Sequence, residues 1–159
     1  MKFIGWNCQG MGRNIGSSHK MEHLSRLMNS TGAQISVISE TRSFRCNSSQ
    51  INPCFNTAGS FVVPSNGLLG GLWLLWSDEV QISIKFSNNY VILAVVVHIA
   101  TNTEFALACV YGDPHHHLTK MIWDHVSTFV FNNLGKPVVF LGDLNEIMHD
   151  VVPMLISCY

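Results

Sequence analysis

The sequence contains few charged residues and almost no net charge. Of its 159 residues, 12% are Asp, Glu, Lys or Arg, and the formal net charge is -1. Without an excess of positive charge the chain lacks the field that draws proteins to a phosphate backbone, which disfavours tight autonomous binding of nucleic acid. The hydrophobic content of 47% excludes a disordered chain. It also leaves few solubilising groups, so self-association is expected.

No apolar run is long enough to cross a bilayer. The most apolar segment, 90–97, has 8 residues, whereas a spanning helix needs about 20. At the amino terminus, the polar residues of 6–9 interrupt the apolar run within a few positions, which does not fit a signal peptide. We therefore expect no membrane partner and an intracellular location.

Metal-binding and phosphate-binding signatures of the common kinds are missing. The sequence has no Cys-x-x-Cys pair, and the glycines after residue 9 lack the Gly-x-Gly-x-x-Gly spacing. The run His115-His116-His117 does not predict a metal site, because consecutive side chains of a helix point in different directions. The five cysteines, expected to be reduced thiols, are Cys8, Cys46, Cys54, Cys109 and Cys158.

The hydrophobic pattern predicts alternating strands and helices. Met21, Leu24 and Met28 recur at helical spacing, while residues 80–86 alternate between polar and apolar as in a half-exposed strand. The predicted strands are 2–6, 34–39, 55–63, 71–76, 80–86, 90–97, 104–111 and 137–141. One predicted helix runs from Ser17 or Ser18 to Gly32, the other has an apolar face from Leu118 to Leu134, and 41–56 is a surface loop or short helix.

These elements predict one α/β (α+β) domain over 1–159. We expect a four-layer sandwich of two packed, mixed, mostly antiparallel sheets with helices outside. The strand-helix-strand segments at 2–40 and 104–142 predict one parallel pair in each half, and the meander between them predicts antiparallel pairing. The alternative, a single doubly wound parallel sheet, would need helices between 55 and 111, where no segment has helical period.

Polar side chains follow three of the predicted strands. The uncharged strand 137–141 is expected to be covered on both faces, and Asp143 and Asn145 come directly after it. By themselves these two residues fit a turn that closes a strand equally well. However, Asn7 and Glu40 also stand at strand ends, and carboxylates with amides form the oxygen-rich ligand set that Mg²⁺ prefers. We therefore predict a catalytic site there.

Four ordered motifs resemble those of a known superfamily. They are Trp6-Asn7-Cys8-Gln9-Gly10, Ser39-Glu40-Thr41, Val110-Tyr111-Gly112 and Gly142-Asp143-Leu144-Asn145-Glu146. In this order they resemble the endonuclease/exonuclease/phosphatase superfamily, whose fold is DNase I-like. Together with the segment 70–76, they most resemble the endonuclease domain of plant LINE-type non-LTR retrotransposons, which accompanies a reverse transcriptase.

The resemblance implies roles for these residues. Glu40 would hold Mg²⁺, or Mn²⁺, with Asn7 orienting metal and phosphate. Tyr111 would donate a hydrogen bond to a phosphate oxygen, although a half-buried strand tyrosine without a role is equally compatible with its position. Asp143 would position or activate the attacking water, and Asn145 would stabilise the charge that builds on phosphorus.

The resemblance ends near Glu146. The family continues with further strands, a later metal-binding Asp and a Ser-Asp-His segment, whereas this sequence closes with 151–159. We therefore expect a single truncated domain, incomplete at its carboxyl terminus, with little or no activity. An uncovered sheet edge would add to self-association.

Three functions remain open. The first is a Mg²⁺-dependent endonuclease that binds and nicks DNA in the nucleus, where Arg13, Arg42 and Arg45 would meet phosphates or remain ordinary loop arginines. The second is a phosphatase or phosphodiesterase that acts on small phosphoesters. The third is a catalytically dead remnant.

Overall fold

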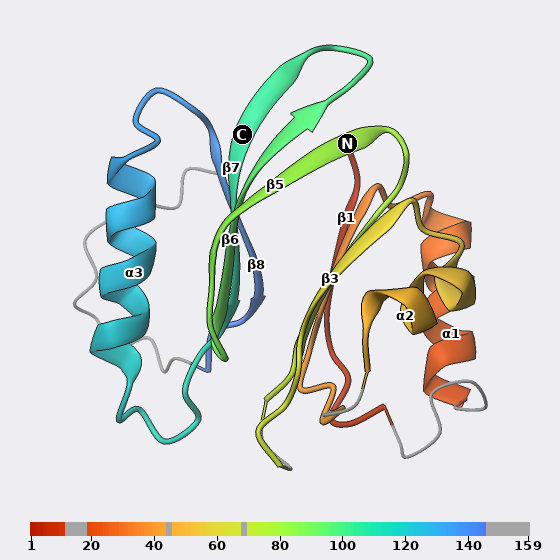
Figure 1. Cartoon of the computed structure of the whole chain (residues 1–159), viewed down its shortest axis with the longest axis horizontal. Helices are drawn as coiled ribbons and strands as arrows, with labels where there is room; N and C mark the ends of the chain where they lie inside the picture. The colour runs from red at the N-terminus through yellow and green to blue at the C-terminus, as the bar shows by residue number, and fades with distance from the viewer. Residues whose placement is uncertain (12–18, 44–45, 68–69, 146–159) are drawn as a thin grey trace.

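Two sheets pack face to face between outer helices. The computed structural model describes residues 1–11, 19–43, 46–67 and 70–145. Its elements are β1 (Phe3–Asn7), α1 (His19–Thr31), β2 (Ile35–Ser39), α2 (Ser48–Phe55), β3 (Gly59–Val63), β4 (Leu72–Trp76), β5 (Val80–Ser87), β6 (Val91–His98), β7 (Thr103–Tyr111), α3 (Thr119–Phe131) and β8 (Val138–Asp143). Helices α1 and α2 cover the first sheet and α3 covers the second (Figure 1). The predicted four-layer sandwich is confirmed.

Each sheet is mixed, as predicted. The strand order is β1-β2-β4-β3 in the first sheet and β5-β6-β7-β8 in the second. Strands β1 and β2 are parallel and joined through α1, and β7 and β8 are parallel and joined through α3, while the other pairs are antiparallel. A parallel pair needs a crossover connection long enough to return the chain, which these helices supply. The doubly wound alternative is wrong.

The principal core lies between the two sheets. It is formed by side chains that alternate with the outward-facing ones along each strand, such as Ile35 and Val37 from β2 and Leu107 and Cys109 from β7. A second cluster joins the first sheet to α1 and α2, and a third joins the second sheet to α3. Three apolar layers therefore hold the strand ends in fixed relative positions.

Strand β8 is not covered on both faces, so that prediction is wrong. Phe140, at 40%, and Gly142 are exposed, and the other residues of the strand are half-buried. The reason is its place at the edge of the second sheet, where Phe140 lies beside Trp123 of α3 rather than under a full layer. An uncharged strand sequence does not reveal whether a further strand pairs with it.

The helices differ from expectation in detail. The segment 41–56 contains α2, which begins with a capping box between Asn47 and Gln50 and ends at Phe55, so Phe55 does not begin β3. Helix α3 ends at Phe131, and Leu134 lies 72% exposed beyond it rather than packing on the sheet. The predicted cap at 17–18 lies outside the described residues. No described helix has the length and apolar character needed to cross a bilayer.

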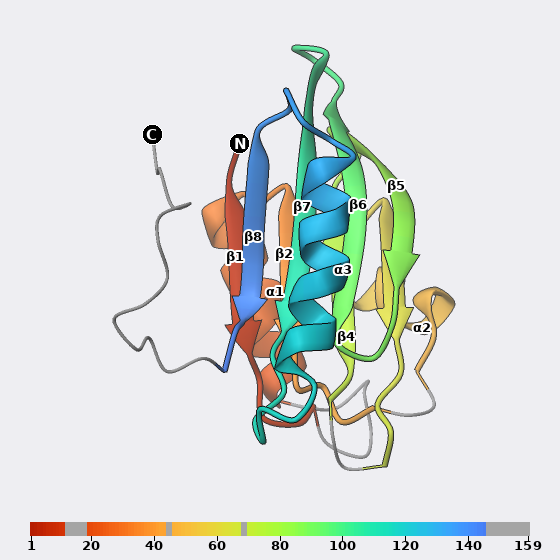
Figure 2. The same cartoon turned by 90° about the vertical axis from the view of Figure 1, so that its left-hand side faces the viewer.

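Strands β1 and β8 meet where the two sheets approach each other. In Figure 2 they run side by side with their carboxyl ends in the same direction. A Cβ added to Gly5 would lie 3.6 Å from the backbone nitrogen of Gly142, an ordinary contact distance that places the two backbones next to each other. The contact brings the last residue of β1 against the last residue of β8.

Candidate active site

Four of the predicted residues converge at one end of the sandwich. Asn7 ends β1, Tyr111 ends β7, Asp143 ends β8, and Glu40 follows β2 directly. Both parallel pairs present their carboxyl ends here, which is the end where open α/β sheets bind ligands. The shared position thus follows from the topology of both halves.

The amide of Asn7 links the two carboxylates. Its Nδ2 donates to Oδ2 of Asp143 at 2.5 Å and to Oε1 of Glu40 at 3.2 Å. Its Oδ1 accepts the backbone N–H of Gln9 at 3.1 Å. Because the oxygen is engaged by a donor, it is the nitrogen that faces the carboxylates. Asn7 therefore fixes the separation and orientation of Glu40 and Asp143.

Glu40 receives donors at both of its oxygens. The hydroxyl of Tyr111 donates to Oε1 at 3.3 Å, and Nη2 of Arg42 lies 3.1 Å from Oε2. The side chain of Glu40 is 15% exposed and that of Arg42 is 46% exposed. This ion pair therefore lies at the surface of the cluster, where water weakens it.

Tyr111 keeps its proton over the physiological range. The residue is 3% exposed. Burial, with the negative charge and hydrogen bond of Glu40 and the charge of Asp143, raises its pKa to about 12. Its hydroxyl is therefore a donor at neutral pH, and it is directed at Oε1 of Glu40.

The Asp143 loop is fixed by its own backbone and by Gly112. The backbone N–H of Asn145 donates to Oδ1 of Asp143 at 3.1 Å, and Nδ2 of Asn145 donates to the carbonyl of Gly112 at 2.8 Å. A Cβ at Gly112 would lie 1.7 Å from the carbonyl oxygen of Leu144, so no larger residue fits there. Asn145 joins the cluster through its backbone, while its side chain contacts the neighbouring strand end.

Left-handed backbone conformations gather around this cluster. Glu40, Arg42 and Asn145 have φ angles of 52°, 50° and 49°. Such conformations are uncommon outside glycine, are disfavoured by about 1–2 kcal/mol, and concentrate at functional sites. The sequence thus maintains strained conformations at the strand ends that present the polar groups.

The donor set is suited to a hard divalent cation. Two carboxylates, from Glu40 and Asp143, face a single guanidinium from Arg42, so the described cluster is net negative. No group of three or more His, Cys, Asp or Glu side chains in the described ranges could hold an ion by itself. Mg²⁺ is commonly held by one or two carboxylates with water and substrate oxygens completing its shell, and these residues fit that pattern.

Asp113 is a buried carboxylate that the sequence analysis did not single out. Burial acts to raise its pKa, but the backbone N–H groups of His115, Leu118 and His117 outweigh it and hold the pKa below the usual 3.8. Its oxygens accept from the N–H of His115 at 3.0 Å and of Leu118 at 2.9 Å, ordering the turn after Gly112. The Asp-Pro pair, a frequent turn signal, could have identified it.

Arg13, Arg45 and Glu146 lie outside the described residues.

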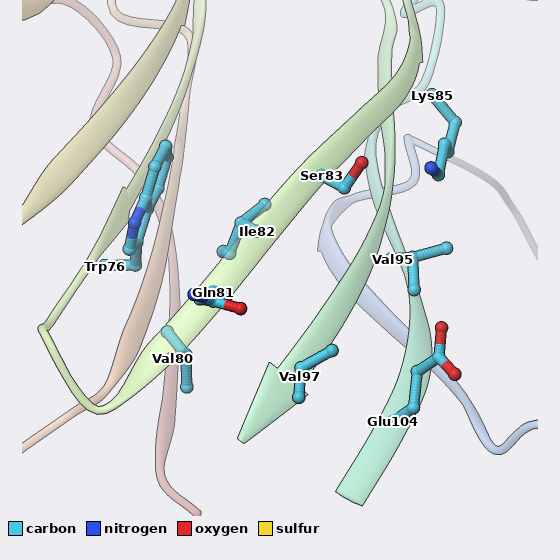
Figure 3. Close-up of a pocket in the computed structure, with 9 residues that line it drawn as sticks. All are labelled: Trp76, Val80, Gln81, Ile82, Ser83, Lys85, Val95, Val97 and Glu104. Atoms are coloured by element: carbon cyan, nitrogen blue, oxygen red, sulfur yellow. The ribbon is translucent and has the colours of Figure 1, made fainter. Parts of the chain in front are cut away.

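A groove elsewhere on the molecule contains none of these residues. Figure 3 shows its lining along β5, with neighbouring side chains from β4, β6 and β7. Glu104, one of the lining residues, lies near the start of β7, seven residues before Tyr111. Seven residues of a strand span roughly 23 Å, so the groove lies far from the strand-end cluster. The candidate active site is therefore the strand-end cluster and not this groove.

The chain shares its fold with solved structures of nucleases and phosphatases. No protein-family model and no curated protein matches the sequence. The structure is similar to truncated Caenorhabditis elegans TDP2 (TM-score 0.57, 16% identity, covering 93% of this chain and 62% of that one). It is also similar to the 3′ phosphatase NExo from Neisseria bound to a product DNA hairpin (TM-score 0.60, 16% identity, 91% and 58% covered).

A third similar structure is an endonuclease/exonuclease/phosphatase family protein from Bacteroides thetaiotaomicron (TM-score 0.63, 11% identity, 90% and 61% covered). The fold is that of these proteins. At such identities the likeness shows the fold alone, and the chain spans about three fifths of the length of each of the three.

Proposed function

We propose that this chain carries the catalytic centre of a Mg²⁺-dependent phosphodiester hydrolase. The observation that supports the proposal is the convergence of Asn7, Glu40, Tyr111 and Asp143 on one point at the strand ends, linked by the Asn7 amide. Hydrolysis of a phosphodiester needs a held cation, an aligned water and neutralised phosphoryl oxygens. The cluster offers groups suited to each of these tasks.

Glu40 would hold the cation, and Asn7, whose Nδ2 faces both carboxylates, would keep Glu40 and Asp143 in place around it. When bound, Mg²⁺ would supply Lewis-acid polarisation of a phosphoryl oxygen. Asp143, oriented by Asn7 and by the N–H of Asn145, would position the attacking water and accept its proton. The protonated Tyr111 would donate to a phosphoryl oxygen. Asn145 uses one of its two amide protons on Gly112, and the other would stabilise charge on phosphorus.

As substrate we propose DNA, nicked by an endonuclease of retrotransposon origin. The support is the resemblance of the strand-end motifs to the plant LINE-type domains and the DNA-bound state of the similar NExo structure. A second candidate is a small phosphoester, favoured by the net charge of -1, which gives no basic field for a long phosphate backbone.

We further propose that the chain by itself is a slow catalyst. Within the described residues no histidine is hydrogen-bonded to Asn7, Glu40 or Asp143. Loss of one transition-state donor typically lowers kcat about 100-fold to 1000-fold. Fusion of a family segment that contains Ser-Asp-His to the carboxyl end is expected to raise the rate by a factor in this range.

The test is Mg²⁺-dependent nicking of supercoiled plasmid with protein in excess over DNA, beside a panel of small phosphoesters. Asp143→Asn should reduce the hydrolysis of whichever substrate is cleaved by at least about 100-fold. Asp124→Asn is the matched control, since Asp124 lies exposed on α3 in a surface ion pair with Lys120.

The pattern of results separates the candidates. Nicking without small-molecule hydrolysis supports the DNA endonuclease, and the reverse supports the small-phosphoester enzyme. If the wild-type chain and the extended chain cleave nothing and bind no Mn²⁺, the proposal is refuted and a catalytically dead remnant is left.

A further inference from the structure

The ammonium of Lys20, an exposed residue, lies against the backbone of the loop that follows β1. Lys20 is the second residue of α1. Its Nζ donates to the carbonyl oxygens of Cys8 at 2.6 Å and Gly10 at 2.9 Å, and lies 3.4 Å from that of Gln9. A lysine ammonium has three donors, so carbonyls of three consecutive residues account for all of them.

Such a convergence of carbonyls needs a special backbone. In an extended segment successive carbonyls point to opposite sides, so three in a row cannot meet one cation. Here Gln9 and Gly10 have φ angles of 49° and 92°, which turn the carbonyls to the same side. Gln9 in this conformation is disfavoured by about 1–2 kcal/mol, which the contacts to Lys20 help to offset. Lys20 lies in the first turn of α1, where the helix dipole disfavours a positive charge. The three carbonyls offset this repulsion, because their oxygens carry partial negative charge.

The same loop directs its N–H groups toward the active site. Gln9 N–H donates to Asn7 Oδ1 at 3.1 Å. Gly10 N–H donates to the carbonyl of Glu40 at 2.7 Å, and Met11 N–H to that of Thr41 at 2.9 Å. The loop therefore has a carbonyl side that faces Lys20 and an N–H side that holds both Asn7 and the backbone of Glu40.

The geometry points to Lys20 as a positioning residue for Asn7. By holding the carbonyls of the loop, Lys20 fixes the Gln9 N–H against Asn7 Oδ1, and this keeps Asn7 Nδ2 on the carboxylates of Glu40 and Asp143. Without the ammonium, the peptide between Cys8 and Gln9 loses the contact on its carbonyl side, and its N–H holds the Asn7 amide less firmly. Only the catalytic consequence of this arrangement rests on the proposed function.

The decisive measurement is the NMR signal of the Asn7 side-chain NH₂ group, identified by its disappearance in Asn7→Ala. In wild-type protein these protons lie between two carboxylates and should exchange slowly with water. Lys20→Met keeps the length of the side chain and removes the donors, so the exchange rate should rise at least about 10-fold. Lys20→Arg should retain slow exchange, because its guanidinium offers five donors to the same carbonyls. Lys136→Met is the matched control, since Lys136 is a hydrogen-bonded lysine, 34% exposed, before β8 at the far end of the sandwich.

Unchanged Asn7 exchange in folded Lys20→Met would overturn the inference. If Lys20→Met does not fold, the wild-type protein still decides it. The ammonium protons of Lys20 should then exchange at least about 10-fold more slowly than those of Lys120, whose side chain is 88% exposed. Equal rates for the two lysines would also overturn it.

Activity supplies a second, separable result. If the chain hydrolyses phosphodiesters, Lys20→Met should lower kcat about 10-fold to 100-fold with little change in KM, as expected when a reacting group is misplaced but substrate binding is not. Lys20→Arg should recover most of kcat. If neither the wild-type chain nor any variant is active, the proposed function fails. The exchange rates of the Asn7 side-chain protons still report whether Lys20 positions Asn7.

Discussion

Replacement of Gly112 by alanine tests whether the Asp143 loop is held by close approach of backbones. The φ angle of Gly112 is not in the left-handed region, so alanine meets no conformational penalty there. The added Cβ would lie 1.7 Å from the carbonyl oxygen of Leu144, whereas real Cβ atoms essentially never approach another atom closer than 3.0 Å. The loop at 143–145 must therefore move by at least about 1.3 Å, since backbone cannot rotate out of the way as a side chain can.

This displacement has two measurable effects. Crowding of a packed position is expected to lower the free energy of unfolding by about 2 kcal/mol. Movement of Asn145 and Asp143 away from Gly112 removes hydrogen bonds worth about 1 kcal/mol more. For a chain of this size a total near 3 kcal/mol lowers Tm by about 6–12 °C. A displacement of about 1 Å at a reacting group typically lowers the rate about 100-fold, so phosphodiester hydrolysis should fall by that factor.

Thermal unfolding followed by circular dichroism measures the first effect whether or not the chain is active. Gly5→Ala is the matched control, because its Cβ would make only an ordinary contact of 3.6 Å with Gly142. That variant should unfold within about 2 °C of wild type. If Gly112→Ala behaves like Gly5→Ala, the close approach of Leu144 does not position this loop and the explanation of the site geometry fails.

Three further predictions follow from the cluster and its surroundings. Glu40→Gln should abolish Mn²⁺ binding, measured by calorimetry, since the amide keeps the shape and loses the charge. The free energy of unfolding should fall by about 1–3 kcal/mol, because one of the two acceptor oxygens of Glu40 becomes a donor. In the folded protein the pKa of Tyr111 is raised from 10.0 to about 12. Its contribution to stability is therefore full below pH 10 and is lost as pH rises toward 12. In urea unfolding at alkaline pH, Tyr111→Phe should remove this loss of stability. In the folded protein the pKa of Asp113 is lowered. Its contribution to stability is therefore present above about pH 4 and is lost as pH falls through its folded pKa. Asp113→Ala should lower the free energy of unfolding by about 1–2 kcal/mol at pH 7 and by less at pH 3.

The fold could be predicted from sequence where the pattern was local. Alternation over 80–86, the uncharged run 90–97 and the helical spacing in 21–28 each identified an element that the structure contains. The two parallel pairs followed from helices between strands, because such a connection permits parallel pairing. The exposure of Phe140 could not be read in this way, since it depends on which strand lies at the edge of the sheet.

The candidate site was predictable in composition but not in its contacts. Residues at strand ends are visible in a sequence, and the motif resemblance identified Asn7, Glu40, Tyr111 and Asp143 together. The contacts of Asn7 with Asp143 and of Lys20 with three backbone carbonyls depend on tertiary approach and left-handed φ angles, which local patterns do not specify. The capping box of Asn47 and Gln50 was readable from sequence, yet the weak hydrophobic pattern around it left a surface loop and a short helix both open, and the structure contains the helix.

The change of sheet between β4 and β5 divides the molecule into two halves, 1–76 and 80–143, each with its own sheet and helical cover. Asn7 and Glu40 belong to the first half, and Tyr111 and Asp143 belong to the second, so neither half contains a site. A chain cut within 77–79 is therefore expected to regain the contact of Asn7 with Asp143 only when its two fragments reassociate. A ligand that binds only the assembled site at the strand ends would lower the free energy of fragment association by RT ln(1 + [L]/Kd), where [L] is the free ligand concentration.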